Sequence, residues 1–276
     1  MSQPVSLADF SAYLLDLDGV VYRGELLLPG ARELVEWIDG TGRKVAFVSN
    51  NSFATVDEVT EKLARLGTPA PQGRVVTAGW ATITTIAQRF PGGRVFPLTG
   101  PSMVTMVRAA GLRPVWLDAE DGPAPDAVLI GLDRTLTYER LARALDAALA
   151  GAALFAVNRD PRLPVEHGFR PGTGAVVAAV EAACGRQAEM IGKPAPGILL
   201  QSLQLLGAQP AQTLMVGDGL DLDIVAGHAA RVATALTLSG LTTADEAARA
   251  TGDRKPDYIF DDLAGLLAAV RNARIQ

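Results

Sequence analysis

Short apolar runs, each ending abruptly in polar or small residues, recur along the chain. Five of them occupy residues 12–19, 44–51, 213–219, 233–240 and 257–262. Continuous apolar runs of this length are typical of strands buried on both faces of a parallel sheet. Between them, apolar positions with a helical period predict helices over Ala31–Ile38, Val56–Leu66 and Ile198–Leu206. Alternating strands and helices predict an α/β fold with a doubly wound parallel sheet.

The middle of the chain has an alternation of its own. Its predicted strands cover 93–100, 113–118, 126–133, 153–158 and 187–191, and its predicted helices cover 102–111, 137–151 and 172–185. Proline and glycine cluster at both edges, in 90–94 and 191–197. We therefore expect a discontinuous core, residues 1–91 and 189–276, with a second α/β domain, residues 92–188, inserted into it. The alternative is one long doubly wound sheet.

Composition narrows the class of protein. The 276 residues are 49% hydrophobic and only 5% aromatic, which predicts a globular chain with an ample aliphatic core. A net charge of −5 speaks against nucleic-acid binding through a broad basic face. The first ten residues lack a basic-then-apolar signal, and no apolar run is long enough for a bilayer, so a cytoplasmic protein without a membrane partner is expected. The single cysteine, Cys184, excludes an internal disulfide and reads as helix packing.

Two carboxylates at the end of the first apolar run are the first candidates for chemistry. Asp16 and Asp18 lie two residues apart and are followed by Gly19. Strand periodicity would point both side chains the same way, beyond the carboxyl end of a strand, where parallel sheets bind ligands. Converging carboxylates share either a proton or a cation. Taken alone, the pattern fits a turn or helix cap equally well.

Polar residues at other strand ends favour a binding site over a turn. Ser49, Asn50 and Asn51 offer a hydroxyl and two amides, Asp218 follows another apolar run, and Lys193 precedes a predicted helix. Together they supply carboxylates for a hard cation, neutral donors for phosphate oxygens, and one ammonium. Mg²⁺ takes a few carboxylate oxygens and keeps several waters, which leaves room for a substrate phosphate.

The order of these pieces resembles the haloacid dehalogenase (HAD) superfamily of phosphohydrolases. Four segments carry the resemblance: 16–24 ("DLDGVVYRG"), 49–51 ("SNN"), 192–194 ("GKP") and 217–224 ("GDGLDLDI"). Within the superfamily the chain looks like the NagD-like branch, which includes p-nitrophenyl phosphatases, and segments 125–141, 158–164 and 171–181 resemble its cap. The resemblance implies a Rossmann-like core, an inserted α/β cap, and a Mg²⁺-dependent phosphatase.

The resemblance also assigns roles to residues. Asp16 would be the nucleophile that forms an aspartyl-phosphate, and Asp18 the general acid and base. The Asp16 carboxylate, the Asp18 carbonyl and Asp218 would hold Mg²⁺. The remaining assignments are phosphoryl binding by Ser49, Asn50, Asn51 and Lys193, positioning of Lys193 by Asp223, and support of the loops by Gly19 and Gly217.

Two stretches bear on details of this assignment. Relatives usually carry an arginine where this chain has Gly219, which puts the packing of that loop in doubt, and Asp221 reads as a helix-start residue. A cap loop of such relatives contacts the leaving group, and the matching stretch here is 158–168. The substrate-binding candidates within it are Asp160, Arg162, Leu163, Pro164 and His167.

Other chemistries have little support in the sequence. The two histidines, His167 and His228, lie far from any serine-nucleophile signature, and with one cysteine they make a poor zinc set. Segment 171–177 is not a dinucleotide-binding glycine loop and reads as a helix start.

The predicted function is hydrolysis of a small phosphomonoester, such as a sugar phosphate, a nucleotide, phosphoglycolate or p-nitrophenyl phosphate. The alternatives are a non-catalytic phosphate-binding or regulatory protein, a phosphotransferase with the same nucleophile, and a metal-free haloacid dehalogenase, against which Asp18 and Asp218 argue. The predicted partner is a small phosphate ester. Because cap-mediated dimers are common among such relatives, a homodimer through the cap is a further expectation.

Overall fold

The computed structural model describes residues 6–52, 54–68, 73–116, 123–164 and 167–273. It divides into two compact units. The first contains 1–49, 56–76 and 193–276, and the second contains 50–55 and 77–192. The second unit is therefore an insertion into the chain of the first. Each has its own sheet, which excludes the single long sheet.

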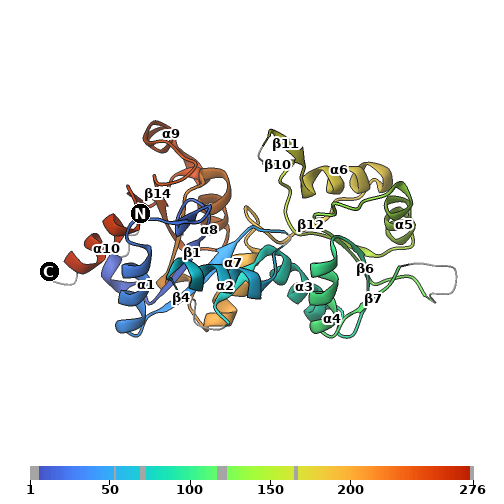
Figure 1. Cartoon of the computed structure of the whole chain (residues 1–276), viewed down its shortest axis with the longest axis horizontal. Helices are drawn as coiled ribbons and strands as arrows, with labels where there is room; N and C mark the ends of the chain where they lie inside the picture. The colour runs from blue at the N-terminus through green and yellow to red at the C-terminus, as the bar shows by residue number, and fades with distance from the viewer. Residues whose placement is uncertain (1–5, 53, 69–72, 117–122, 165–166, 274–276) are drawn as a thin grey trace. The chain divides into compact units, whose positions relative to one another are not determined.

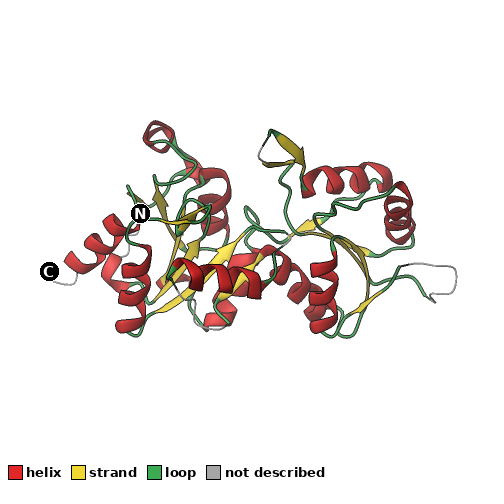
Figure 2. Ribbon diagram, in the orientation of Figure 1, coloured by secondary structure: helices red, strands yellow, loops and turns green. Residues whose placement is uncertain are grey.

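The first unit is built on a six-stranded sheet in the order β15-β14-β13-β1-β4-β5, with helices on both faces (Figures 1 and 2). Its strands are β1 (Ala12–Asp16), β4 (Lys44–Ser49), β5 (Val75–Thr77), β13 (Thr213–Gly217), β14 (Ala233–Thr237) and β15 (Tyr258–Phe260), and a hairpin is formed by β2 (Tyr22–Arg23) and β3 (Leu26–Leu27). Its helices are α1 (Ala31–Gly40), α2 (Val56–Leu66), α7 (Gly197–Leu206), α8 (Val225–Ala229), α9 (Ala244–Arg249) and α10 (Leu263–Asn272). Short helical segments are η1 (Leu7–Asp9), η2 (Pro210–Gln212), the π-helical η3 (Leu220–Ile224) and η4 (Gly252–Arg254).

The second unit has a five-stranded sheet in the order β12-β9-β8-β6-β7, in which every neighbouring pair is parallel. Its strands are β6 (Arg94–Leu98), β7 (Arg113–Pro114), β8 (Ala127–Ile130), β9 (Ala153–Ala156) and β12 (Glu189–Met190), with an antiparallel hairpin of β10 (Arg162–Pro164) and β11 (Phe169–Pro171). Its helices are α3 (Ala78–Arg89), α4 (Pro101–Ala109), α5 (Tyr138–Leu149) and α6 (Thr173–Cys184).

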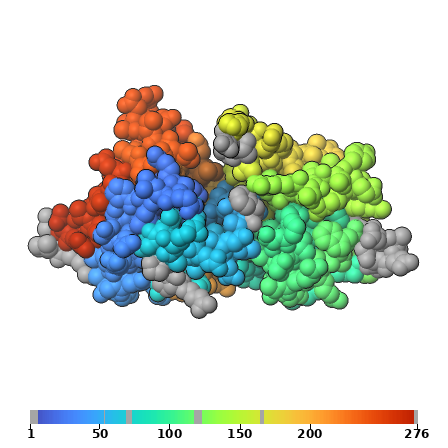
Figure 3. Space-filling model, viewed as in Figure 1, coloured from blue at the N-terminus to red at the C-terminus, as the bar shows by residue number. Residues whose placement is uncertain are grey.

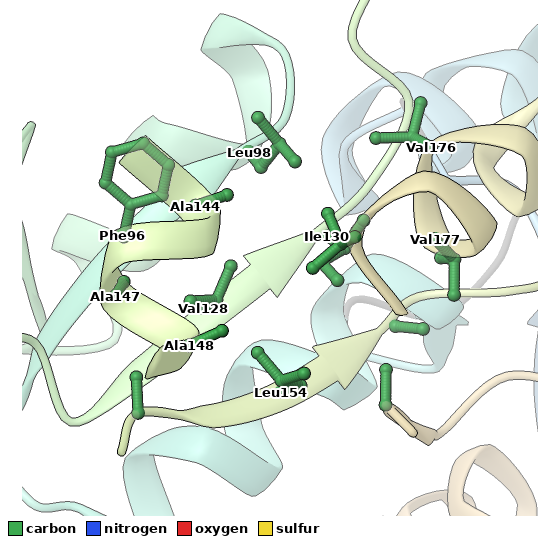
Figure 4. Close-up of a cluster of buried hydrophobic side chains, with 14 residues drawn as sticks. Phe96, Leu98, Val128, Ile130, Ala144, Ala147, Ala148, Leu154, Val176 and Val177 are labelled. Carbon is green, nitrogen blue, oxygen red and sulfur yellow. The ribbon is translucent and has the colours of Figure 1, made fainter. Parts of the chain in front are cut away.

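Buried apolar faces hold the elements in place. In α1 the buried positions Ala31, Leu34, Val35 and Ile38 recur with the helical period, whereas all five residues of β1 are buried, as a central parallel strand requires. In the second unit, Figure 4 shows Val128 and Leu154 facing the small and branched side chains of α5 and α6. Cys184 is partly buried and packs against this cluster, in agreement with its predicted role.

Segments far apart in sequence make up the first unit. Figure 3 shows N-terminal residues in blue lying directly against C-terminal residues in orange and red. Strands β1 and β13 pair in parallel although residues 17–212, about 70% of the chain, separate them and include the whole second unit. Within the described residues, no helix has the length and apolar character needed to cross a membrane.

The boundary between the units differs from the expected division at 91/92. Residues 77–91, including α3, belong to the second unit, because α3 packs on β8, β9 and α4. At the other boundary the change occurs between Gly192 and Lys193 rather than at 188/189. The 113–118 strand is shorter than expected, since β7 contains only Arg113 and Pro114, and residues 117–118 lie outside the described part.

Candidate active site

The carboxyl ends of three neighbouring strands place the candidate residues of the first unit at one edge of its sheet. Asp16 is the last residue of β1 and pairs in register with Val48, so Ser49 ends the adjacent strand β4 just beyond it. On the other side Leu15 pairs with Val216, so Asp218 follows β13 at the same edge. Strand β1 leads through α1 to β4, whereas β13 leads through η3 and α8 to β14. This is a topological switch point, where open parallel sheets bind ligands.

Three buried aspartates meet there around one lysine. Carboxylate oxygens of Asp16, Asp218 and Asp223 all lie within 4.8 Å of one another. The Lys193 Nζ atom, in a side chain only 2% exposed, donates to Asp16 Oδ1 and, at 2.6 Å, to Asp223 Oδ1. A single ammonium therefore bridges two of the three carboxylates.

Burial and mutual repulsion dominate the electrostatics of this cluster. Burial raises the pKa of Asp16, against the opposing effect of the Lys193 ammonium. Burial, followed by the charge of Asp223, raises the pKa of Asp218 to about 6. Burial alone would lower the pKa of Lys193, but the carboxylates of Asp16 and Asp223 outweigh it and raise that pKa. The cluster therefore carries more negative charge than one lysine compensates.

The aspartates differ in how much hydrogen-bonding capacity they retain. Asp223 is saturated, because Oδ1 accepts from Lys193 and Oδ2 accepts from the backbone N–H groups of Asp218 and Gly219 at 3.2 and 3.0 Å. Asp16 uses Oδ1 for Lys193, and Asp218 uses Oδ2 for the Leu241 N–H at 2.8 Å. Each of these two keeps one oxygen with no hydrogen-bond donor among the described residues. Two carboxylate oxygens without donors, in a cluster with excess negative charge, fit a hard divalent cation such as Mg²⁺.

Glycines make room for the carboxylates. A Cβ atom at Gly19, whose φ is +85°, would lie 2.1 Å from Asp218 Oδ2, and one at Gly240 would lie 1.8 Å from the same oxygen. A Cβ atom at Gly217 would lie 2.1 Å from the Asp223 Cβ atom. The predicted supporting glycines, Gly19 and Gly217, thus stand where any side chain would displace an aspartate.

Asp18 lies at the surface beside the cluster. Enough protein surrounds its carboxyl group to raise its pKa by loss of hydration, against the opposing charges of Lys62 and Lys193. Lys62 itself lies over the Tyr22 ring, 3.8 Å from the centroid. Sequence reasoning had not singled out Lys62, because a lysine on an amphipathic helix resembles any solvated charge.

The segment that follows Ser49 passes into the second unit. Ser49 is 5% exposed, whereas Asn50 and Asn51 are counted with the second unit. There the Asn50 carbonyl accepts from Asn158 Nδ2 at 2.8 Å, and Asn51 Oδ1 accepts from the Ala54 N–H at 2.8 Å. The structure thus brings Asp16, Asp218, Lys193, Asp223 and Ser49 to one edge, and it fixes Asn50 through a different partner.

Three of the five candidate cap residues line a cavity within the second unit. Its volume is about 380 Å³, and its lining includes Asp160, Arg162, Leu163 and Asn158. Arg162 lies over the Phe169 ring at 5.0 Å, and the Asp160 N–H faces Asn158 Oδ1 at 3.4 Å. Pro164 is in the adjoining strand β10. His167 is exposed and does not line this cavity.

The loop after β14 is a part of the site that sequence reasoning missed. The Leu241 N–H reaches the Asp218 carboxylate, the Thr242 hydroxyl donates to the Asp218 carbonyl at 2.6 Å, and Ser239 donates to the Gly19 carbonyl at 2.7 Å. Since β14 neighbours β13, the small and polar residues that end the 233–240 run were the available signal.

The fourth motif folds as a tight turn into η3. Gly219, at φ −110°, precedes η3, and its N–H contributes to holding Asp223. Asp221 lies in the first turn of η3, as predicted, and pairs with Arg254 at 2.8 Å. Although this chain has Gly219 where relatives usually carry an arginine, the loop is held by hydrogen bonds from the Asp218 and Gly219 N–H groups to Asp223 Oδ2.

Family models and relatives match this arrangement. Residues 13–113 match the model described as haloacid dehalogenase-like hydrolase, and residues 190–266 match a HAD-hydrolase-like model. A curated acid sugar phosphatase from Staphylococcus aureus is 34% identical over 262 residues, covering 95% of this chain and 98% of that protein.

Solved structures agree over nearly the whole chain. A 4-nitrophenylphosphatase from Thermotoga maritima superposes with a TM-score of 0.87 at 33% identity, covering 96% of this chain and 98% of that one. A glycerol phosphate phosphatase from Mycobacterium tuberculosis, solved in complex with magnesium, gives a TM-score of 0.84 at 36% identity, covering 95% and 78%.

A doubly wound sheet with a carboxylate cluster and one lysine at its switch point has the chemistry that suits a hard cation and an oxyanion. The matches make the class specific: the chain belongs to the haloacid dehalogenase-like hydrolases, in their NagD-like branch. It is a phosphoric monoester hydrolase that acts on small phosphate esters, which excludes the non-catalytic alternative.

Proposed function

We propose that this protein hydrolyses small phosphomonoesters with Mg²⁺ through an aspartyl-phosphate on Asp16. The observation that carries the proposal is that Asp16 and Asp218 each keep one carboxylate oxygen without a hydrogen-bond donor among the described residues, next to a buried lysine that contacts the other oxygen of Asp16. A nucleophilic carboxylate, a cation site and an ammonium at one sheet edge are what phosphoryl transfer needs, since its catalysis is mainly positioning and charge stabilisation.

In the first step, an Asp16 carboxylate oxygen attacks phosphorus and the bond from phosphorus to the ester oxygen breaks. Asp18 donates a proton to the departing oxygen, which leaves as an alcohol. In the second step, Asp18 takes a proton from water, the water oxygen attacks phosphorus, and the bond to Asp16 breaks to release phosphate. Lys193 offsets the charge of the phosphoryl oxygens in both steps.

The Asp16 and Asp218 carboxylates and the Asp18 carbonyl would hold Mg²⁺. When bound, Mg²⁺ supplies positive charge that offsets the repulsion between carboxylate and phosphate. Asp223 acts by position: it holds Lys193 and the turn at Gly219. Ser49, Asn50 and Asn51 would donate to the phosphoryl oxygens.

The names of the relatives support a substrate that is a phosphate ester with a small leaving group. Their names specify sugar phosphate, glycerol phosphate and 4-nitrophenyl phosphate. We infer that the second unit acts as the cap that selects the leaving group, with Asp160 and Pro164 among its binding residues. A homodimer through this unit and a cytoplasmic location stay predictions.

The test is Mg²⁺-dependent release of p-nitrophenol from p-nitrophenyl phosphate by wild type, Asp16→Asn and Asp221→Asn. The last is a matched control, an exposed aspartate that pairs with Arg254. Asp16→Asn should lose at least about 10³-fold in turnover, because an amide is a poor nucleophile, whereas Asp221→Asn should stay near wild type. Turnover that survives in Asp16→Asn, or that resists EDTA in wild type, would contradict the mechanism.

A further inference from the structure

The second unit has a topological switch point of its own. Strands β6 and β8 are parallel neighbours, with Val95 paired to Ala127 and Leu98 to Ile130. Beyond its carboxyl end, β6 leads through α4 to β7 on one side, whereas β8 leads through α5 to β9 on the other. Open parallel sheets bind ligands between two such diverging connections. No residue of the proposed phosphatase site lies in either connection.

A cavity of about 560 Å³ occurs at this place, which is within the usual range for small-molecule sites. Its lining comes from the segments that follow three strands: Thr99 and Pro101 after β6, Trp116 after β7, and Thr135, Glu139 and Arg140 after β8. Val104, Thr105, Arg108, Arg143 and Phe96 complete it.

The charges around the cavity favour an anion. Arg140 forms an ion pair with the fully buried carboxylate of Asp133, and it donates to the carbonyls of Pro97 and Thr99 at 3.1 and 3.2 Å. Arg143 pairs with Glu139 at 2.9 Å. Arg108 is exposed and has no hydrogen bond or ion pair with any residue in the described part of the chain. Arg108 is therefore the cation available to a ligand.

The same cavity offers the surface of an aromatic ring. Trp116 is 40% exposed although it is large and apolar, and its ring centroid lies 5.6 Å from the Arg140 guanidinium carbon. An indole beside a guanidinium suits a planar ring better than an aliphatic one.

We propose that this cavity binds a small anion that carries a planar aromatic ring, of the nucleoside monophosphate class. The anionic group would pair with Arg108, and the ring would lie on Trp116. The proposal does not depend on the phosphatase mechanism, since none of these residues belongs to the candidate active site.

The test measures binding of adenosine 5′-monophosphate by calorimetry and by quenching of tryptophan emission, with EDTA present so that no turnover occurs. Adenosine and inorganic phosphate serve as probes that lack the anion or the ring. Each should bind at least tenfold more weakly than the nucleotide. Binding of inorganic phosphate as strong as that of the nucleotide would overturn the role of the ring.

Variants locate the site. Arg108→Gln and Trp116→Leu should each weaken nucleotide binding at least tenfold, and Trp116→Leu should also remove the quenching. Arg249→Gln is the matched control, an exposed arginine of the first unit that should bind like wild type. Asp16→Asn should also bind like wild type. Hydrolysis of p-nitrophenyl phosphate by Arg108→Gln should be unchanged, which shows that the variant folds.

Two outcomes would overturn the proposal. One is the absence of nucleotide binding up to millimolar concentration. The other is binding that Arg108→Gln and Trp116→Leu leave intact, which would assign the nucleotide to the phosphatase site or to another surface.

Discussion

The two parallel sheets place an aspartate beyond a strand at each switch point and use it in opposite ways. In the first unit, Asp218 follows β13 and keeps one carboxylate oxygen without a donor among the described residues. In the second unit, Asp133 follows β8, and both of its oxygens are engaged, by Thr135 and by Arg140. Both side chains are buried.

The difference shows that burial alone does not identify a functional aspartate. Asp133 is matched by a cation and by hydrogen bonds, so its charge contributes to folding. Asp218 lies beside Asp16 and Asp223, and burial together with the charge of Asp223 raises its pKa, which disfavours its ionised form. A carboxylate oxygen that accepts no hydrogen bond and lies beside other carboxylates is the feature expected of an aspartate that binds a ligand, whereas a structural aspartate has both oxygens paired.

Among the variants that test the contrast between Asp218 and Asp133, Asp218→Asn is expected to have the largest effect on turnover. Turnover should fall at least about 100-fold, since even residues behind metal ligands cost 10–100-fold when changed. In EDTA the variant should be as stable as wild type or more stable, by roughly 1–3 kcal/mol at pH 7. The sign follows from the pKa: a carboxyl whose folded pKa is raised to about 6 is ionised at pH 7 at a cost that a neutral amide avoids.

Urea denaturation in EDTA and a Mg²⁺ titration of turnover measure both parts. A marked loss of stability in the metal-free variant would show that Asp218 is structural, and the contrast with Asp133 would fail.

Asp133→Asn should show the converse. Unfolding free energy should fall by about 2–4 kcal/mol, because the substitution leaves the half-buried Arg140 without its counter-charge. Hydrolysis of p-nitrophenyl phosphate at 25 °C should change little. The control is Asp146→Asn, an exposed aspartate 3.8 Å from Arg143, where the change should be under about 0.5 kcal/mol. Equal destabilisation by both variants would mean that the buried pair of Asp133 and Arg140 contributes no more to the unfolding free energy than an exposed pair does.

A smaller effect on activity is expected for Asn158→Ala. Asn158 is 3% exposed and donates to the Asn50 carbonyl, so it fixes the backbone of a proposed phosphate-binding residue. Turnover should fall about tenfold through misplacement of that backbone, with kcat reduced more than KM rises. Thr173→Val is the control, because it removes the nearby 3.1 Å contact between the Thr173 and Ser52 hydroxyls without touching Asn50. An effect as large in Thr173→Val would indicate general loosening instead.

Hydrophobic patterning predicted most of the fold. All five apolar runs of the core contain strands, and helix α2 has the bounds that the pattern predicted. These elements are buried on a regular period, and that period is local information. Helix α3 was missed, because a run rich in threonine shows little helical propensity and its packing on β8 and β9 is tertiary. The position of α3 moved the boundary of the inserted unit from 91/92 to 76/77.

The order of the motifs indicated that Asp16, Asp218 and Lys193 belong to one site, and in the structure these three residues lie at one edge of the first unit's sheet. The motifs did not predict which neighbouring residues hold these side chains in place. Gly240 and Leu241 reach Asp218 across the strand pairing of β13 with β14, and that pairing appears only once the sheet is assembled. Similarly, the cavity around Trp116 combines residues after three separate strands, none of which forms a sequence motif.

The smallest expected effect is a change in the pH dependence of stability, and it concerns Glu181 in the second unit. Glu181, 9% exposed, accepts two hydrogen bonds from Arg159 and one from the Ala188 N–H. Hydrogen bonding by Arg159 lowers the pKa of Glu181, with the Ala188 N–H acting in the same direction and burial opposing. A lowered folded pKa stabilises the fold above the unfolded pKa of about 4.5, and this stabilisation disappears as pH falls through the folded value.

Glu181→Gln should therefore cost roughly 1–2 kcal/mol at pH 7, and the difference from wild type should shrink as pH is lowered below about 4.5. Urea denaturation at pH 7, 5 and 4 measures it. Glu189→Gln is the control, since its pair with Arg89 is 45% exposed on both sides and should contribute under about 1 kcal/mol at any of these values. A Glu181 effect that stays constant down to pH 4 would mean that packing, not charge, gives Glu181 its weight. The second unit would then match its charges less completely than the contrast between Asp133 and Asp218 implies.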